Sequence, residues 1–277
     1  MLKLEITLSE NISEENIDIL SALIYSYEVD GIEVLENGLS VFLSEELFSS
    51  SDFKLSLEEW QTIQPFTYQW EELPNINWNK EWESNFDPVF VDDFLTIKAE
   101  FHNIPTSTKH TIIINPKMSF GTGHHATTWM VSKLMAQLDF KNKKVLDAGS
   151  GTGVLAILAN VLGATDIVAF DNDPWCYENA LENLEINGVT NIKLIEGSLA
   201  EVDEADFDII LANINRNFIL EHGNELANKL KNDSLLIVSG FLIQDVKLIL
   251  DYFHNLSMVA QYLLTKGDWS CVILKKW

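Results

Sequence analysis

Apolar and polar residues alternate over Leu2–Leu8, the first stretch of the chain, and this pattern predicts a strand with one buried face. Apolar side chains then recur at helical spacing, and Ser13 stands where a residue would cap the helix. Further on, an Asn37-Gly38 pair typical of a tight hairpin turn separates two alternating stretches. The predicted elements are a strand at Leu2–Leu8, a helix at residues 13–27, strands at Gly31–Leu35 and 39–43, and a helix at 55–63. They predict a small α+β domain with a ferredoxin-like arrangement.

Three aromatic residues recur every four positions in the segment that follows this domain. Trp78, Trp82 and Phe86 would share one face of a helix, which Pro88 would end. Such a stripe serves either as a packing contact that joins domains or as a surface on which a ligand stacks. We favour packing, because an apolar stripe on a helix usually faces a core. Residues 73–108 are therefore interpreted as a linker that contains an aromatic helix.

Beyond Thr111, short apolar runs alternate with helical segments. This alternation predicts an α/β domain of the Rossmann-like type with a mainly parallel sheet. Strands are expected at residues 143–147, 166–170, 192–196, 207–212, 234–238, 256–264 and 269–274. The last two are close enough in the chain to form an antiparallel pair. The resulting division is a small domain at residues 1–72, a linker at 73–108 and an α/β domain at 109–277.

The composition narrows the class of protein. No uninterrupted apolar run reaches the roughly 18 residues that span a bilayer, and the first residues lack the apolar block of a signal peptide. Cys176 and Cys271 are isolated from each other in the sequence, which favours two buried thiols in a reducing compartment. We therefore expect a cytoplasmic protein that makes no membrane contact.

The net charge of −24, with 18 Lys and Arg against 42 Asp and Glu, opposes a nucleic-acid substrate. Proteins that read nucleic acids usually carry a basic surface for the phosphates. A basic protein or an amine fits this charge better. Acidity can also serve solubility alone, so the charge is a weak filter.

The strand expected at 143–147 runs directly into three glycines. Gly149, Gly151 and Gly153 form a G-x-G-x-G pattern behind Asp147. Glycines allow the backbone to turn sharply and to approach a ligand, and the N–H groups that open the next helix can face a polar group. Dinucleotide-binding proteins carry G-x-G-x-x-G instead. The spacing found here is similar to that of methyltransferases that use S-adenosylmethionine (SAM).

Asp171 follows the strand expected at 166–170. A carboxylate at that position can accept hydrogen bonds from both hydroxyls of a ribose, in a SAM site as in an NAD site. Asp171 therefore indicates a nucleoside without identifying it, and the glycine spacing favours SAM. We interpret Asp173 as structural, because it can cap a helix that has Pro174 in its first position.

Two more motifs make the resemblance specific. Residues 115–128 read Asn-Pro-Lys-Met-Ser-Phe-Gly-Thr-Gly-His-His-Ala-Thr-Thr, and residues 211–214 read Leu-Ala-Asn-Ile after the fourth strand. Together with the glycine loop, they resemble the ribosomal protein L11 methyltransferase family (PrmA) in order and spacing. The Trp-Asn-Lys-Glu-Trp sequence at 78–82 and the small leading domain are also similar to that family, so the resemblance covers nearly the whole chain.

This resemblance implies a SAM-dependent methyltransferase domain at 109–277 and a substrate-recognition role for residues 1–72. It implies SAM contacts at Thr128, Gly149, Asp171 and Asn213, with Asp147 and Gly151 as further contacts from the glycine loop. Residues 120–123 would form a lid over the methionine part of SAM, with Phe120 at the mouth. The implied acceptors are lysine ε-amines, the N-terminal α-amine, or both, on ribosomal protein L11. We hypothesise that the side-chain carbonyl of Asn213 orients the amine, and we expect a monomer.

Some positions depart from the family or remain open. Ala126 stands where the family often has proline, and residues 215–217, Asn-Arg-Asn, replace a short apolar residue near the substrate mouth. Ser198 is either close to the adenine or an ordinary loop serine. His124 and His125 have no Cys, Asp or Glu at ligand spacing beside them, so we expect no metal. The alternatives are a methyltransferase with another acceptor, a SAM-binding module without activity, and an NAD-dependent oxidoreductase.

Overall fold

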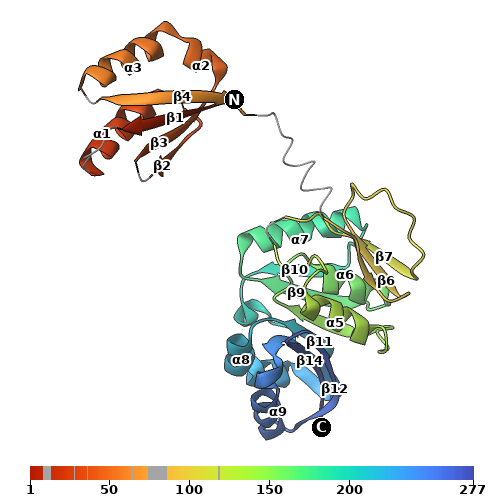
Figure 1. Cartoon of the computed structure of the whole chain (residues 1–277). Coiled ribbons are helices and arrows are strands. Elements are labelled where there is room, and N and C mark those ends of the chain that lie inside the picture. Colours follow the sequence, from red (N-terminus) through yellow and green to blue (C-terminus); the bar gives the residue numbers. More distant parts are fainter. Residues whose placement is uncertain (9–13, 28, 36, 64, 74–85, 118) are drawn as a thin grey trace. The chain divides into compact units, whose positions relative to one another are not determined.

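A computed structural model describes residues 1–8, 14–27, 29–35, 37–63, 65–73, 86–117 and 119–277. The chain divides into two compact units, Met1–Asn85 and Phe86–Trp277. Figure 1 shows the elements of both units coloured along the sequence. Each unit has its own sheet and its own buried apolar core.

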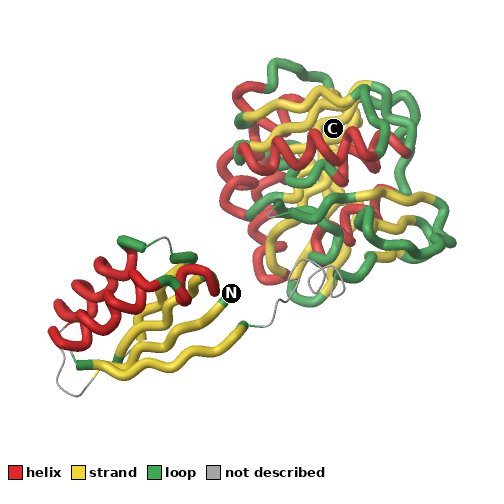
Figure 2. The backbone as a smooth tube through the Cα atoms, turned by 90° about the horizontal axis from the view of Figure 1, so that it is seen from above, coloured by secondary structure: helices red, strands yellow, loops and turns green. Residues whose placement is uncertain are grey.

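The leading unit is a four-stranded antiparallel sheet covered by helices. Its elements are β1 (Leu2–Leu8), α1 (Glu14–Tyr25), β2 (Gly31–Leu35), β3 (Gly38–Leu43), α2 (Glu45–Ser49), α3 (Ser51–Ile63) and β4 (Phe66–Glu72). The strand order is β2-β3-β1-β4, with β1 antiparallel to both β3 and β4. This order corresponds to the ferredoxin-like β-α-β-β-α-β arrangement. The helices lie together on one face of the sheet (Figure 2), where Leu4 and Ile6 of β1 are fully buried.

Three features of this unit differ from the sequence prediction or lie beyond it. Helix α3 begins at Ser51 rather than at residue 55, because the Ser50 hydroxyl accepts the N–H of Phe53 and stabilises the first turn. The elements predicted from the sequence did not include α2 or β4. The predicted helix cap, Ser13, lies outside the described residues.

Most of the aromatic stripe predicted for the linker also lies outside the described residues, and Phe86, its last member, is in neither helix nor strand. From Val89 onward the chain belongs to the second unit. Strands β5 (Val89–Val91), β6 (Leu95–Lys98) and β7 (His110–Ile113) form a small three-stranded sheet whose side chains enter the core of that unit. Residues 86–108, which we assigned to the linker, are therefore part of the second unit.

The second unit is built on a seven-stranded sheet with the order β10-β9-β8-β11-β12-β14-β13. The strands are β8 (Lys144–Ala148), β9 (Asp166–Asp171), β10 (Ile192–Glu196), β11 (Phe207–Asn213), β12 (Leu230–Leu242), β13 (Met258–Lys266) and β14 (Trp269–Lys276). The first five pair in parallel, whereas β14 is antiparallel to both β12 and β13. The predicted α/β class, the mainly parallel sheet and the antiparallel pair at the end are confirmed.

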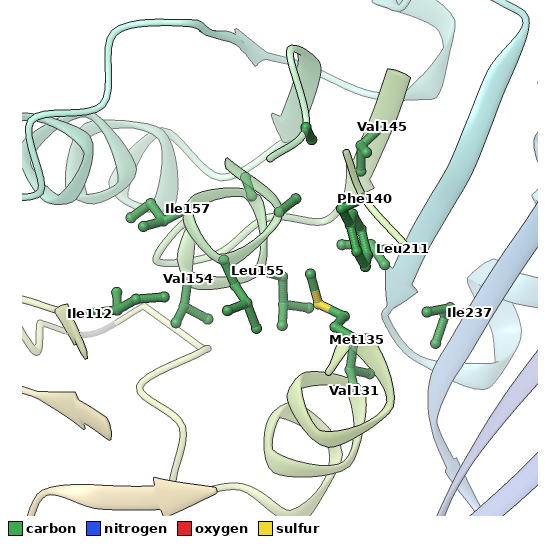
Figure 3. Packing of buried hydrophobic residues seen from close by; sticks show 14 of the residues in the cluster. Ile112, Val131, Met135, Phe140, Val145, Val154, Leu155, Ile157, Leu211 and Ile237 are labelled. Atoms are coloured by element: carbon green, nitrogen blue, oxygen red, sulfur yellow. The ribbon is translucent and has the colours of Figure 1, made fainter. Parts of the chain in front are cut away.

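Helices cover both faces of this sheet (Figure 1). The helices are α5 (Ala126–Met135), α6 (Val154–Val161), α7 (Pro174–Ile186), α8 (Arg216–Lys229) and α9 (Val246–Asn255), with short 3-10 turns at Leu199–Glu201 and Ile243–Asp245. Val131 of α5 and Leu155 of α6 pack with Val145 and Leu211 of the sheet in one core (Figure 3). The core on the other face includes Ile219 of α8 and Phe253 of α9, as well as alternate residues of the same strands. Among the described helices, none is long and apolar enough to cross a membrane.

Candidate functional site

A cavity of about 530 Å³ lies at the carboxyl ends of the parallel strands. From β8 the chain continues outward through β9 to β10, whereas β11 and β12 lie on the opposite side of β8. Ligands of open α/β sheets bind outside the carboxyl ends at such a change of direction. The cavity is lined by Phe120, His125, Thr127, Gly149, Gly151, Phe170, Asp171, Asn172, Asp173, Cys176, Ser198, Asn213, Ile214, Asn215, Phe218, Gly240 and Trp269.

The glycine loop adopts a backbone that other residues rarely tolerate. Gly149 has φ +70° and Gly151 has φ +53°. A Cβ on Gly149 would lie 2.3 Å from a methyl carbon of Ile214, and a Cβ on Gly151 would lie 2.2 Å from the carbonyl oxygen of Phe120. Since these distances are far below van der Waals contact, the two positions require glycine for both conformation and space.

Asp171 holds this loop in place. Its Oδ2 accepts the N–H of Gly151 at 2.8 Å, and its Oδ1 accepts the N–H of Asp173 at 3.1 Å. A carboxylate has about four lone-pair positions, so two hydroxyls can still donate to Asp171. Asp173 caps α7 by accepting the N–H of Trp175 at 2.9 Å, with Pro174 at the first helical position. The structural interpretation of Asp173 is therefore confirmed, although Asp173 also lines the cavity.

Asp147 points away from the cavity. Its side chain is buried, and its Oδ2 accepts the N–H of Ala156 in α6 at 3.0 Å. Oδ1 has no hydrogen-bond partner among the described residues. Burial raises the pKa of the Asp147 carboxyl to about 7, although the Ala156 hydrogen bond acts in the opposite direction. Asp147 thus supports the loop from beneath and is not among the residues that line the cavity.

This raised pKa makes stability depend on pH in an unusual direction. The folded chain retains a proton on Asp147 up to about pH 7, whereas the unfolded chain loses it near pH 4. The contribution of Asp147 to the free energy of unfolding is therefore largest below pH 4. It falls by up to about 4 kcal/mol as the pH rises to 7. We expect Asp147→Asn to raise the Tm at pH 8 more than at pH 5, as measured by thermal unfolding without ligand. An equal change in Tm at both pH values would contradict the assignment.

Asn213 is the last residue of β11 and lines the cavity. Its Nδ2 donates to the Thr128 Oγ1 at 3.3 Å, which leaves the Oδ1 atom directed away from that contact. The Oδ1 atom is buried and has no partner in the described part of the chain. Thr128 itself is fully buried in α5 and does not line the cavity. Of the two predicted contacts, Asn213 thus lines the cavity, whereas Thr128 contacts Asn213 and does not line it.

Aromatic rings surround the mouth of the cavity. Phe120 is half exposed, and its carbonyl accepts the N–H of Thr152 at 2.9 Å. The ring of His125 lies 5.1 Å from the ring of Phe120 and 4.7 Å from that of Trp269. Burial lowers the pKa of His125, whose side chain caps α5 by accepting the N–H of Thr127. The three rings therefore form an apolar part of the mouth, and the lowered pKa favours the uncharged form of His125.

Several lining residues were not found by sequence reasoning. Trp269 begins β14 and Phe218 lies in α8, and neither stands in a recognisable motif. Cys176 was expected to be buried, but it is half-buried in the cavity wall, because it lies on the side of α7 that faces the loop. Cys271 is buried as expected, and burial raises its pKa to about 12.

The structure also gives the positions of Ser198 and of the His124-His125 pair. Ser198 lines the cavity and also forms a capping box with Glu201, and its position close to the adenine stays a prediction. Within the described ranges, no group of three or more His, Cys, Asp or Glu side chains can hold a metal ion. His124 and His125 instead form hydrogen bonds with Thr122 and Thr127.

The strand order, the glycine loop at the end of β8 and the acid at the end of β9 define a Rossmann-like class I methyltransferase. The model of the family described as ribosomal protein L11 methyltransferase (PrmA) matches residues 9–277. This chain therefore belongs to the ribosomal protein L11 methyltransferase family.

Individual relatives support this membership. The chain is 35% identical to a ribosomal protein L11 methyltransferase of Phocaeicola vulgatus over 277 residues, which cover 98% of each protein. It is 36% identical to one of Chlorobaculum tepidum, over 73% of this chain and 72% of the relative. A crystal structure of a ribosomal protein L11 methylase from Lactobacillus delbrueckii subsp. bulgaricus matches with a TM-score of 0.61 and 28% identity, covering 69% of this chain and 99% of that one.

Proposed function

We propose that this enzyme transfers methyl groups from SAM to amines of ribosomal protein L11. The observation that carries the proposal is that the glycine loop, Asp171 and Asn213 line one cavity, and that the buried Asn213 Oδ1 atom has no partner among the described residues. The names of the relatives suggest the acceptor protein. We further propose that the enzyme acts in the cytoplasm as a monomer and that residues 1–72 recognise the substrate.

The residues that line the cavity support SAM as the cofactor. The two glycines let Ile214 and the Phe120 carbonyl approach the loop, where a Cβ would clash with them, and Gly151 directs its N–H at Asp171 rather than into the cavity. Asp171 would hold the ribose hydroxyls, and Ser198 would lie toward the adenine. When bound, SAM supplies an electrophilic methyl group on a positively charged sulfur. Phe120 would cover the methionine part of the site.

The acceptor amine has to arrive without a proton, because its lone pair attacks the methyl group. Lysine has a pKa of about 10.4 and an N-terminal α-amine one of about 7.7–8.0, so the α-amine is closer to its reactive form at neutral pH. The apolar mouth formed by Phe120, Trp269 and neutral His125 would lower the pKa of either amine by desolvation. The Asn213 Oδ1 atom would then accept a hydrogen bond from the amine N–H and orient the lone pair. Holding the reactants in line contributes several kcal/mol to lowering the barrier.

Intact mass spectrometry tests the proposed function. We expect purified unmodified ribosomal protein L11 to gain mass in units of one methyl group when it is incubated with SAM and this enzyme. If SAM binds but the mass of L11 does not change, then the acceptor is another molecule or the protein is a non-catalytic binder. Asn215 lines the cavity in the segment that departs from the family, so the mouth is where a different acceptor would be selected. If NAD rather than SAM stabilises the purified protein against thermal unfolding, then the cofactor assignment is wrong.

The role of Asn213 can be separated from cofactor binding. We expect Asn213→Ala to lower kcat at least tenfold, because the amine loses its hydrogen-bond acceptor. Thr128→Val removes the partner of Asn213 Nδ2 while conserving volume, and we expect a smaller loss of kcat. Steady-state kinetics with saturating SAM measure both effects, and calorimetry measures the Kd for SAM. An Asn213→Ala enzyme with unchanged kcat and SAM affinity would exclude the orienting role.

A further inference from the structure

Two histidines bind the first residues of the second unit, Phe86–Trp277, which we call the catalytic unit. His124 Nε2 lies 2.8 Å from the carbonyl oxygen of Asp87, and His102 Nε2 contacts the carbonyl oxygen of Phe86. The Phe86 ring lies 4.5 Å from the ring of His124. Phe86 and Asp87 are the first described residues after the segment 74–85, through which the chain connects the two units. The position of this junction is therefore fixed by contacts to the catalytic unit.

The hydrogen bonds of His124 define its tautomer. The carbonyl of Asp87 can only accept, so His124 Nε2 carries the hydrogen and donates. Nδ1 of the neutral ring is then an acceptor, and the Thr122 hydroxyl donates to it at 3.1 Å. Thr122 belongs to the lid, residues 120–123. His124 thus connects the lid to the junction through two consistent hydrogen bonds.

The other side of the lid is attached to the glycine loop. Thr152 donates its N–H to the Phe120 carbonyl at 2.9 Å and its hydroxyl to the Gly121 carbonyl at 2.8 Å. The lid also packs against β6, because a Cβ on Gly123 would lie 2.7 Å from Ile97. It is therefore held between the cofactor loop on one side and the junction at residues 86–87 on the other.

We infer that His124 is a positioning residue that couples the cofactor site to the junction with the leading domain. A ligand that fixes the lid against the glycine loop also fixes Asp87, and thereby the place from which the chain leaves toward the substrate-recognition domain. Coupling of this kind is reciprocal, so bound cofactor raises the affinity for the protein substrate, and bound substrate raises the affinity for cofactor. The inference rests on the proposed function, since it requires that residues 1–72 capture the acceptor.

Hydrogen exchange measures the coupling without any substrate. We expect saturating S-adenosylhomocysteine to slow amide exchange in residues 86–91 of the wild-type protein. His124→Ala should bind S-adenosylhomocysteine yet lose this protection, whereas His124→Gln, whose Nε2–H can replace the ring Nε2–H, should recover part of it. His254→Ala, at an exposed position in α9, is the matched control and should behave as wild type. Equal protection in wild type and His124→Ala, or none in wild type, would overturn the inference.

Binding of ribosomal protein L11 provides the second measurement. We expect S-adenosylhomocysteine to tighten its Kd about fivefold in wild type, which is the low end of typical coupling, and to leave it unchanged in His124→Ala. A fivefold effect that persists in His124→Ala would also refute the role of His124. If L11 binds neither form, then the proposed acceptor fails, while the exchange experiment still decides whether His124 couples the cofactor to the junction.

Discussion

Replacing Asp171 by alanine is expected to lower the affinity for SAM and for S-adenosylhomocysteine at least a hundredfold. Hydrogen bonds to a charged group contribute about 1.5–3 kcal/mol each, and two ribose hydroxyls would lose their acceptor. The same change frees the N–H of Gly151, so the glycine loop loses the bond that fixes its course. Isothermal titration calorimetry with S-adenosylhomocysteine measures this loss directly and needs no protein substrate.

Asp173→Ala is the matched control. Asp173 also lines the cavity with a carboxylate, but that carboxylate caps α7 and makes no bond to the glycine loop. We expect this variant to lose about 1 kcal/mol of stability, the usual effect of removing a helix cap, and to retain SAM affinity within a few fold. If both variants bind equally weakly, then the negative charge of the cavity matters rather than the position of Asp171. Wild-type affinity in Asp171→Ala would refute the ribose role.

The sequence predicts the centre of the catalytic unit well because its signals are local. The strands that became β8, β9 and β11 are mostly apolar and mostly buried, as expected for strands that are covered on both faces. Parallel strands bring their carboxyl ends to one edge, so the residues that end or directly follow them meet there. Gly149, Asp171 and Asn213 are such residues, and the structure brings all three to one cavity.

The predicted SAM contact at Asp147 is not supported by the lining of the cavity. Side chains alternate along a strand, so Asp147 lies on the same face of β8 as Val145, which packs beneath the helices. The loop begins two residues later, and there the backbone rather than a side chain approaches the ligand. Membership of the motif therefore did not imply contact with the cavity. Thr128 similarly does not line the cavity, and its Oγ1 accepts a hydrogen bond from Asn213.

The remaining differences come from exposure and from long-range pairing. In strand β4, aromatic and polar residues alternate from Phe66 to Trp70, but only Phe66 is buried, so the strand contributes little to the core. Trp269 reaches the cavity because β14 inserts between β12 and β13, an order that local patterns do not encode. Residues 86–108 carried few element signals, although Leu95 and Ile97 are buried in the catalytic unit. These contacts join residues that are far apart in the sequence.

Gly151→Ala is expected to abolish binding of S-adenosylhomocysteine while the fold remains intact. A Cβ at this position would lie 2.2 Å from the Phe120 carbonyl oxygen, so the lid has to move and the bond from Thr152 N–H to that carbonyl is lost. The φ angle of +53° adds about 1–2 kcal/mol of backbone strain for any residue with a Cβ. Thermal unfolding with and without S-adenosylhomocysteine measures both effects, the strain as a lower Tm and the clash as a missing ligand-induced shift.

Gly188→Ala separates these two effects. Gly188 has φ +65°, close to that of Gly151, but a Cβ there would meet nothing within 4 Å. The strain is therefore similar in the two variants, and each should lower the Tm by roughly 2–4 °C per kcal/mol. The Gly188 variant should retain the full ligand-induced shift, because it leaves the Phe120 carbonyl undisturbed. If Gly151→Ala also retains that shift, then close approach of the lid to the loop is not required for cofactor binding, and the inferred transmission from loop to lid fails with it.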